Sequence, residues 1–107
     1  MQRVPVKVIT RGVVPPGASA WVPLPRIIVF KRPEWITERL TAHELVHVVQ
    51  YERHGLLFPL LYVLAWARAG FSYSNNEFER EARALENNHA YLAWARDLIA
   101  TLDDTEG

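Results

Sequence analysis

Two histidines stand four residues apart in the segment TAHELVHVVQYERHG, which covers Thr41–Gly55. Residues four apart lie one above the other on an α-helix, so His43 and His47 can direct both imidazole rings at one point. The surrounding apolar residues repeat with helical spacing in two stripes, which predicts a buried central helix over residues 33–55, ending at its glycine. The rest of the chain must pack around this helix.

The first third of the chain, residues 1–32, is rich in β-branched residues and proline. Short strands are expected at Val4–Thr10 and Arg26–Lys31, separated by a turn around Pro15–Gly17. Two strands form at best a hairpin or a small sheet, which needs helices to pack against. We therefore expect this segment to lean on the central helix.

Two more helices are expected after the central one, over residues 58–70 and 75–102. The first overlaps the apolar run Leu56–Ala67, which is shorter than the roughly 20 residues that span a bilayer. We expect it to be a buried helix, with an interfacial helix as the alternative. The second has Asn75 or Asn76 as its cap and an apolar stripe of helical spacing.

A chain of 107 residues is expected to form one domain, residues 1–107, of the α+β class. A small N-terminal β-hairpin or sheet would pack on the three α-helices. The chain has no cysteine, which excludes disulfides and thiolate metal sites. The charges of twelve basic and twelve acidic residues cancel, so the net charge gives no reason to expect nucleic acid as a partner. Basic residues dominate residues 1–33, and acidic residues dominate residues 77–107.

The N-terminus, MQRVPVKVIT, lacks the long apolar core of a secretion signal. No apolar run is long enough to span a membrane. We expect a soluble, cytoplasmic protein.

The HELVH segment has the chemistry of a zinc site. A zinc ion that hydrolyses an amide needs neutral imidazoles as ligands and a carboxylate that takes a proton from its water. His43 and His47 provide the imidazoles, and Glu44, offset by one residue, is placed as a general base. Thr41 and Glu44 also spell a capping box, but a helix that begins upstream would leave both in its interior.

A catalytic zinc site needs a third protein ligand. His54 lies seven residues after His47, about 10 Å along the helix axis, which is too far for one metal ion. The third helix carries better candidates in the segment NNEFEREARALENNHA. They are Glu79, Glu81, Glu86 and His89.

The segments HELVHVVQ and FEREA together resemble the gluzincin family of zinc metallopeptidases, in which a glutamate on a later helix completes the site. The resemblance implies Zn²⁺ held by His43, His47 and Glu79, with Glu44 as the catalytic base. It implies a zincin-like endopeptidase that hydrolyses peptide bonds in peptide or protein substrates. The short chain is similar to the minimal members, the minigluzincins, which have a small sheet and three helices and can be made in latent form.

The resemblance also suggests how a substrate is held. In similar enzymes an extended peptide pairs with an edge strand above the active helix, and Arg26–Lys31 is the candidate for that strand. Tyr73 is a candidate donor to the oxyanion. Latency could come from the segment VVPPGASAWVPLP or from the acidic tail, in which Asp103 could reach the zinc.

One position departs from the gluzincin pattern. Arg83 stands where many members have an acid that orients a histidine ligand, so another group must hold the second nitrogen of His43 or His47. Two alternatives to a peptidase follow from the residues. One is a non-catalytic zinc-binding structural or interaction module, and the other is a metal-free helical interaction protein. The sequence does not set the oligomeric state.

Overall fold

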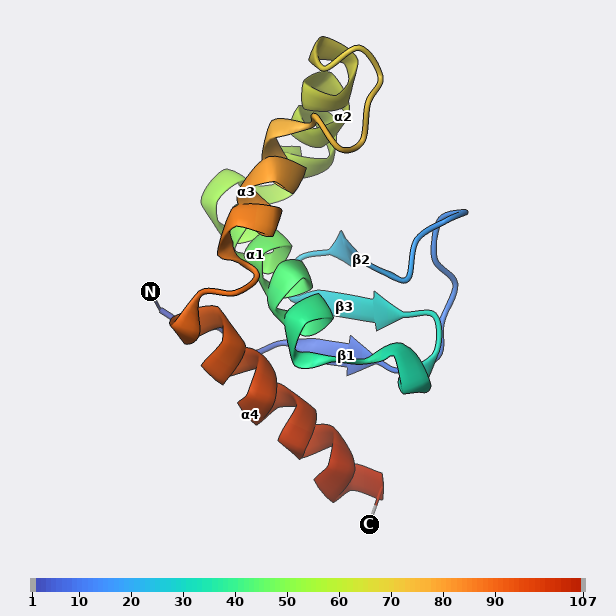
Figure 1. The fold of residues 1–107 in the computed structure, drawn as a ribbon, viewed down its shortest axis with the longest axis vertical. Coiled ribbons are helices and arrows are strands. Elements are labelled where there is room, and N and C mark those ends of the chain that lie inside the picture. Colours follow the sequence, from blue (N-terminus) through green and yellow to red (C-terminus); the bar gives the residue numbers. More distant parts are fainter. Residues whose placement is uncertain (1, 107) are drawn as a thin grey trace.

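Three short strands form a mixed sheet in the computed structural model, which describes the backbone of residues 2–106 and the side chains of residues 2–102. The strands are β1 (Lys7–Ile9), β2 (Ala20–Leu24) and β3 (Ile27–Phe30). β3 lies in the middle, parallel to β1 and antiparallel to β2 (Figure 1). The strands predicted within residues 4–10 and 26–31 are thus present, and they pair in parallel rather than as a hairpin.

Strand β2 was not predicted, because its sequence AWVPL contains a proline and follows a proline-rich turn. Proline is tolerated on an edge strand, where its missing N–H faces away from the sheet. The expectation that Arg26–Lys31 forms the edge is wrong, since β3 is the central strand and its residues from Ile28 to Phe30 are buried. The open edge nearer the central helix belongs to β2.

The central helix, α1, covers Glu38–His54, and its predicted end is confirmed. Gly55 ends it with a φ of 67°, a left-handed conformation that glycine adopts without steric cost. The predicted start is wrong, because Pro33–Trp35 forms a separate 3-10 turn. Thr37 caps α1 instead, its side chain accepting a hydrogen bond from the backbone N–H of Leu40.

The α+β class, with a small sheet packed on helices, is confirmed. α2 covers Phe58–Arg68 as predicted. The segment expected as one third helix is divided into α3 (Glu77–Leu85) and α4 (His89–Glu106). Asn76 caps α3, as predicted, and the side chain of Asn88 accepts a hydrogen bond from the backbone N–H of Ala90 in the first turn of α4.

Helix α1 lies between the sheet and the C-terminal helices (Figure 1). Its buried face packs on β3 on one side and on α3 and α4 on the other. The fully buried members of this core include Ile28, Phe30, Ala42, Leu45 and Ala82. Burial of such side chains is the main favourable contribution to folding, so α1 is fixed on both sides.

Helix α2 extends away from this core, and the expectation that it is buried is wrong. Only Phe58 and Ala65 of its eleven residues are buried, in a second cluster with Tyr51 and Phe78. Among the described residues, no helix is both long and apolar enough to cross a membrane.

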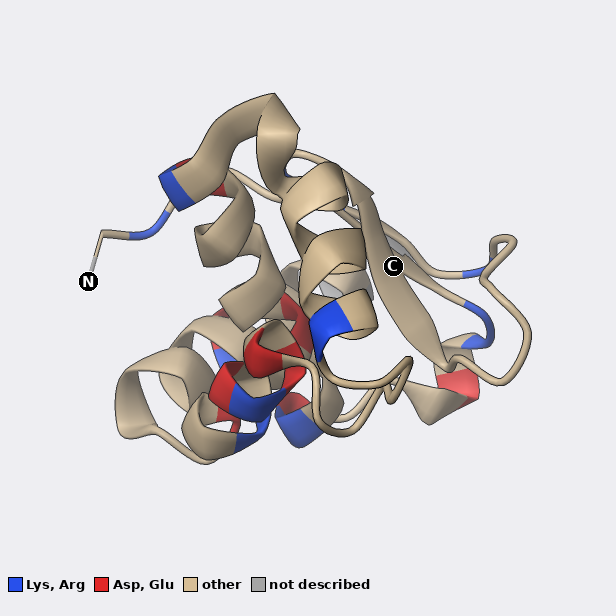
Figure 2. Cartoon of the chain, turned by 90° about the horizontal axis from the view of Figure 1, so that it is seen from above, with Lys and Arg blue, Asp and Glu red and all other residues tan. Residues whose placement is uncertain are grey.

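Ion pairs join the basic N-terminal segment to the helices. Arg3 contacts Asp97 of α4 at 2.8 Å, and Arg26 contacts Glu52 of α1 at 2.6 Å. Figure 2 shows most red segments on the helices and several blue segments on the loops beside the sheet. The uneven distribution of charge along the chain thus partly serves to join the N-terminal segment to the helices.

Candidate metal centre

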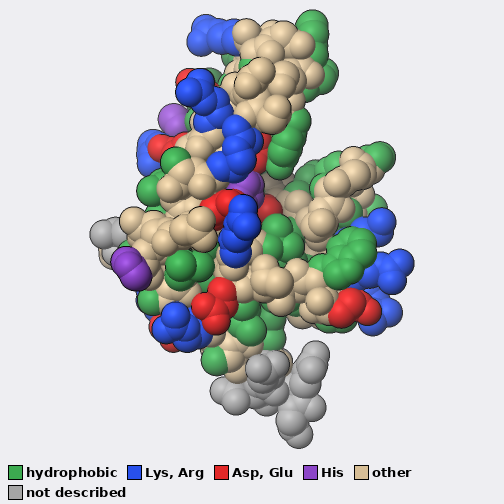
Figure 3. Space-filling view, in the orientation of Figure 1, with side chains coloured by type: hydrophobic (Ala, Val, Ile, Leu, Met, Phe, Trp, Pro, Cys, Tyr) green, Lys and Arg blue, Asp and Glu red, His purple; other side chains and the backbone are tan. Residues whose placement is uncertain are grey.

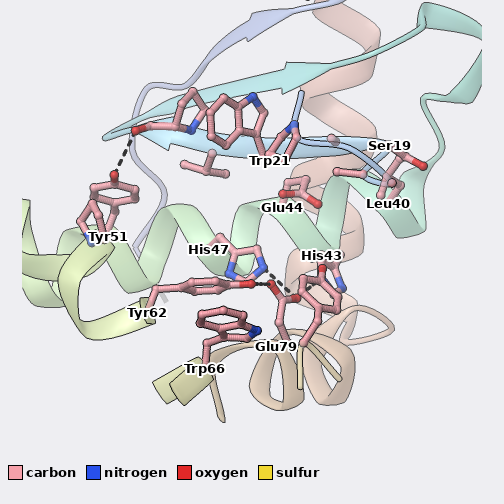
Figure 4. Close-up of a pocket in the computed structure, with 18 of the residues that line it drawn as sticks. Ser19, Trp21, Leu40, His43, Glu44, His47, Tyr51, Tyr62, Trp66 and Glu79 are labelled. Carbon is pink, nitrogen blue, oxygen red and sulfur yellow. Dashed lines mark hydrogen bonds and ion pairs between the residues drawn. The ribbon is translucent and has the colours of Figure 1, made fainter. Parts of the chain in front are cut away.

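Helices α1 and α3 bring the three predicted ligands to one point. The Nε2 atoms of His43 and His47 lie 3.0 and 3.2 Å from Oε1 of Glu79. One ligand atom from each of the three residues lies within 4.8 Å of the others. Figure 4 shows both imidazoles directed from α1 toward Glu79.

This donor set fits a zinc ion. Zinc binds imidazole nitrogen and carboxylate oxygen at about 2.0–2.2 Å, so neighbouring ligand atoms of a tetrahedral site lie about 3.3–3.5 Å apart. The two distances from Glu79 are within a few tenths of an ångström of that spacing. Two histidines and one glutamate are also a ligand set that catalytic zinc sites use, leaving a position for water.

The second nitrogen of His43 is held by Glu86, the residue that follows α3. Nδ1 of His43 lies 2.8 Å from Oε2 of Glu86, while the guanidinium of Arg39 donates to Oε1 of the same carboxylate at 2.9 Å. Burial raises the pKa of Glu86, but the hydrogen bonds from His43 and Arg39 bring it below its usual value. Arg83 points elsewhere, to the carbonyl of Ser74.

The second nitrogen of His47 is held within α1 itself. Its Nδ1 lies 2.7 Å from Oε1 of Gln50, whose amide nitrogen donates to the carbonyl of Phe78 and to Glu81. Because these partners sit on α3, Gln50 links the two helices that carry the ligands. With Nδ1–H bound in this way, Nε2 is the nitrogen that faces the common point.

The other candidate ligands lie away from this point. Glu81 faces Gln50 and Arg53. His54 stacks on Phe58 at the end of α1, and His89 begins α4. Glu86 is close, but as the partner of His43.

Tyr62 of α2 holds the far oxygen of Glu79. Its hydroxyl donates to Oε2 at 2.6 Å, which leaves Oε1 directed at the histidines. Burial raises the pKa of Glu79, but hydrogen bonds from His43, His47 and Tyr62 hold it well below the usual range. Glu79 is therefore ionised at neutral pH, as a metal ligand must be.

Glu44 is buried beside the ligands without joining them. Only 5% of its surface is exposed, and Figure 4 shows its carboxylate on the side of α1 that faces β2. Burial raises the pKa of Glu44, and so does the negative charge of Glu79, while the two histidines lower it. A raised pKa suits a carboxylate that accepts and returns a proton near neutral pH.

A cleft of about 1000 Å³ opens over these residues, between α1, α2, β2 and the Pro15–Ser19 segment. Figure 3 shows it as a hollow between the upper part of the molecule and the sheet side. Its walls are mainly apolar and include Trp21, Phe58 and Trp66. Tyr73 lines the mouth, whereas the side chain of Asp103 lies outside the described residues.

Sequence reasoning did not find two of the residues that support the ligands. Gln50 stands three residues after His47, so helical spacing places it on the same face and the signal was available. Tyr62 lies on a different helix with no fixed spacing to any ligand. Glu86 was considered only as a metal ligand. The prediction of one continuous helix over residues 75–102 gave no reason to expect Glu86 at the end of a helix, where it meets His43.

No match to this chain was found among protein-family models, curated proteins or solved structures.

The metal-stripped protein should lose stability as pH rises from about 6.5 to 9. Burial lowers the pKa of His43, but hydrogen bonds to Glu79 and Glu86 and the charge of Glu44 raise it to about 9; the pKa of His47 is raised in the same way. A histidine whose pKa is raised in the folded state stabilises the fold. This contribution is fully present below the pKa of the unfolded chain, near 6.5, and is lost as the pH rises through the folded-state pKa of about 9. Urea unfolding with a chelator should show a decrease on the order of 3 kcal/mol.

The variant with His43→Gln and His47→Gln should have a much flatter profile over the same pH range. A wild-type free energy of unfolding that stays constant or rises between pH 6.5 and 9 would contradict the buried cluster.

Replacing Glu86 by glutamine should weaken zinc binding by about 10- to 100-fold, the usual effect of losing the carboxylate that orients a histidine ligand. The affinity can be measured by competition with a chromophoric chelator. Glu77→Gln is the matched control, because Glu77 is exposed in the first turn of α3. Equal affinities of the two variants would show that Glu86 does not orient His43.

Proposed function

We propose that this protein is a zinc-dependent metalloendopeptidase, with zinc held by His43, His47 and Glu79 and with Glu44 as general base. The observation that carries the proposal is the convergence of these three donors on one point, beside a second buried carboxylate, that of Glu44. A structural zinc site would be closed by four protein ligands. Here the group of three opens on a cleft instead.

A zinc ion at this point would supply a Lewis acid that lowers the pKa of a bound water to about 7. The protein's part is to move protons and to hold the reactants. Glu44 accepts a proton from the attacking water and later returns it to the leaving amine. Glu86 and Gln50 keep the imidazoles oriented through both steps.

The open edge of β2 is suited to bind an extended peptide. The backbone N–H of Lys31, just after β3, donates to the carbonyl of Ser19, just before β2, and Trp21 of β2 pairs with Val29 of β3, so the backbone groups of Ser19 and Trp21 face β3. Backbone groups alternate in an antiparallel ladder, which leaves those of Ala20, before the register shift between Trp21 and Leu24, facing away from the sheet. A substrate strand can pair with them while its side chains enter the apolar cleft.

Two tyrosines have different roles in this proposal. Tyr62 donates a hydrogen bond to Oε2 of Glu79, and Tyr73, which lines the same cleft and also interacts with Glu79, is the candidate donor to the oxyanion. Burial and the negative charge of Glu79 raise the pKa of Tyr73, which keeps its hydroxyl protonated. The Pro15–Ser19 segment lines the same cleft, so it is the described part of the chain that can limit access and keep the enzyme latent.

Replacing Glu44 by glutamine should reduce peptidase activity by at least about 10²- to 10⁴-fold, the contribution of a positioned general base. Zinc content should be unchanged, because Glu44 is not a ligand. Cleavage of a fluorescently labelled unstructured protein is the assay, and Glu52→Gln on the same helix is the control.

Full activity of Glu44→Gln would contradict the proposed mechanism. Bound zinc with no cleavage by the wild-type protein, even after removal of the Pro15–Ser19 segment, would instead support the non-catalytic zinc-binding module.

A further inference from the structure

Exposed hydrophobic side chains gather at one end of the molecule. Of the thirteen large hydrophobic residues that are exposed in the described part of the chain, eight belong to the segment 56–73. We call them the α2 patch; they are Leu56, Leu57, Leu60, Val63, Leu64, Trp66, Phe71 and Tyr73. Helix α2 and its flanking turns form the upper end of the molecule in Figure 1. Monomeric soluble proteins rarely leave a large apolar patch uncovered.

The segment that carries the α2 patch has basic but no acidic side chains. Residues 53–76 contain no Asp or Glu. Arg68 is exposed in the last turn of α2, whereas the neighbouring α3 exposes both Arg80 and Glu77. Seen from this end, the helix nearest the viewer is free of red and carries one blue segment (Figure 2). An apolar helix flanked by cations is the chemistry that binds anionic lipid surfaces.

An exposed aromatic residue, Phe71, stands in the turn that follows α2. Phe71 is 67% exposed and has a φ of 63°, a left-handed conformation that is uncommon for a bulky residue. Its ring packs edge to face on Trp66, with centroids 4.9 Å apart. Aromatic side chains are enriched where proteins meet the headgroup level of a membrane. Contact with Trp66 thus fixes the ring of Phe71 although this ring remains exposed.

We propose that the α2 patch docks on an anionic lipid surface. α2 projects from the core as a convex end about 16 Å long, so a lipid surface can cover it without a complementary groove. The apolar side chains enter the acyl boundary, and Arg68 contacts lipid phosphates. Val63 and Trp66 line both the patch and the cleft, so the cleft opens beside the membrane. This docking does not depend on the zinc site.

The test is flotation of the full chain with two kinds of vesicle, phosphatidylcholine alone and phosphatidylcholine mixed with phosphatidylglycerol. We expect binding to the anionic vesicles that weakens with added salt. The double variant Leu57→Glu with Leu60→Glu should reduce the bound fraction at least about tenfold. The matched control is Val13→Glu with Leu24→Glu, because these side chains are 87% and 56% exposed against 63% and 57% for the test pair.

Three results would overturn the proposal. They are no binding to either vesicle, binding that the α2 variant leaves unchanged, and an equal loss of binding in the control variant. A second copy of the protein could cover the α2 patch instead of a lipid surface, and light scattering on the same samples detects such a dimer. A dimer that the α2 variant dissociates, in a protein that binds no vesicle, would assign the patch to self-association.

Discussion

The pairing of buried ionisable side chains is the constraint on which the rest of this structure depends. Glu44, His47 and Glu79 are each less than 10% exposed, and a buried charge without a partner is very costly. The structure satisfies this constraint by surrounding Glu79 with two imidazoles and a tyrosine hydroxyl. A divalent cation at the same point would neutralise the two carboxylates directly.

Helix α1 connects this cluster to the core. One side of the helix packs on the central strand of the sheet, and the other meets α3, which carries Glu79. Gln50 and Glu86 then join the two helices through the histidine rings. Because the candidate ligands are placed by packed helices rather than by loops, their spacing is fixed by the same contacts that stabilise the fold.

Local signals were enough to predict part of this structure. Helical spacing placed His43 and His47 on one face, and Gly55 marked the end of α1. The break between α3 and α4 was hidden, because the apolar stripe keeps the same spacing across it while Asn88 caps a new helix. Strand β2 could not be predicted from its sequence, because a proline interrupts its strand pattern.

Long-range contacts account for the remaining differences. The role of Tyr62 depends on how α2 lies against α3, which no local pattern specifies. The exposure of α2 has the same origin, since its apolar composition is that of a buried helix. Whether such a helix is covered depends on which elements reach it, and in this fold α4 packs on α1 instead.

Zinc content by elemental mass spectrometry tests the central claim most directly, measured on the purified protein before and after reconstitution. We expect one zinc ion per chain in the wild-type protein and in Glu81→Gln, and none in Glu79→Gln. The comparison is sharp because both glutamates lie on α3 and only Glu79 faces the histidines. A protein that takes up no zinc after reconstitution, or that loses it only with Glu81→Gln, would contradict the account.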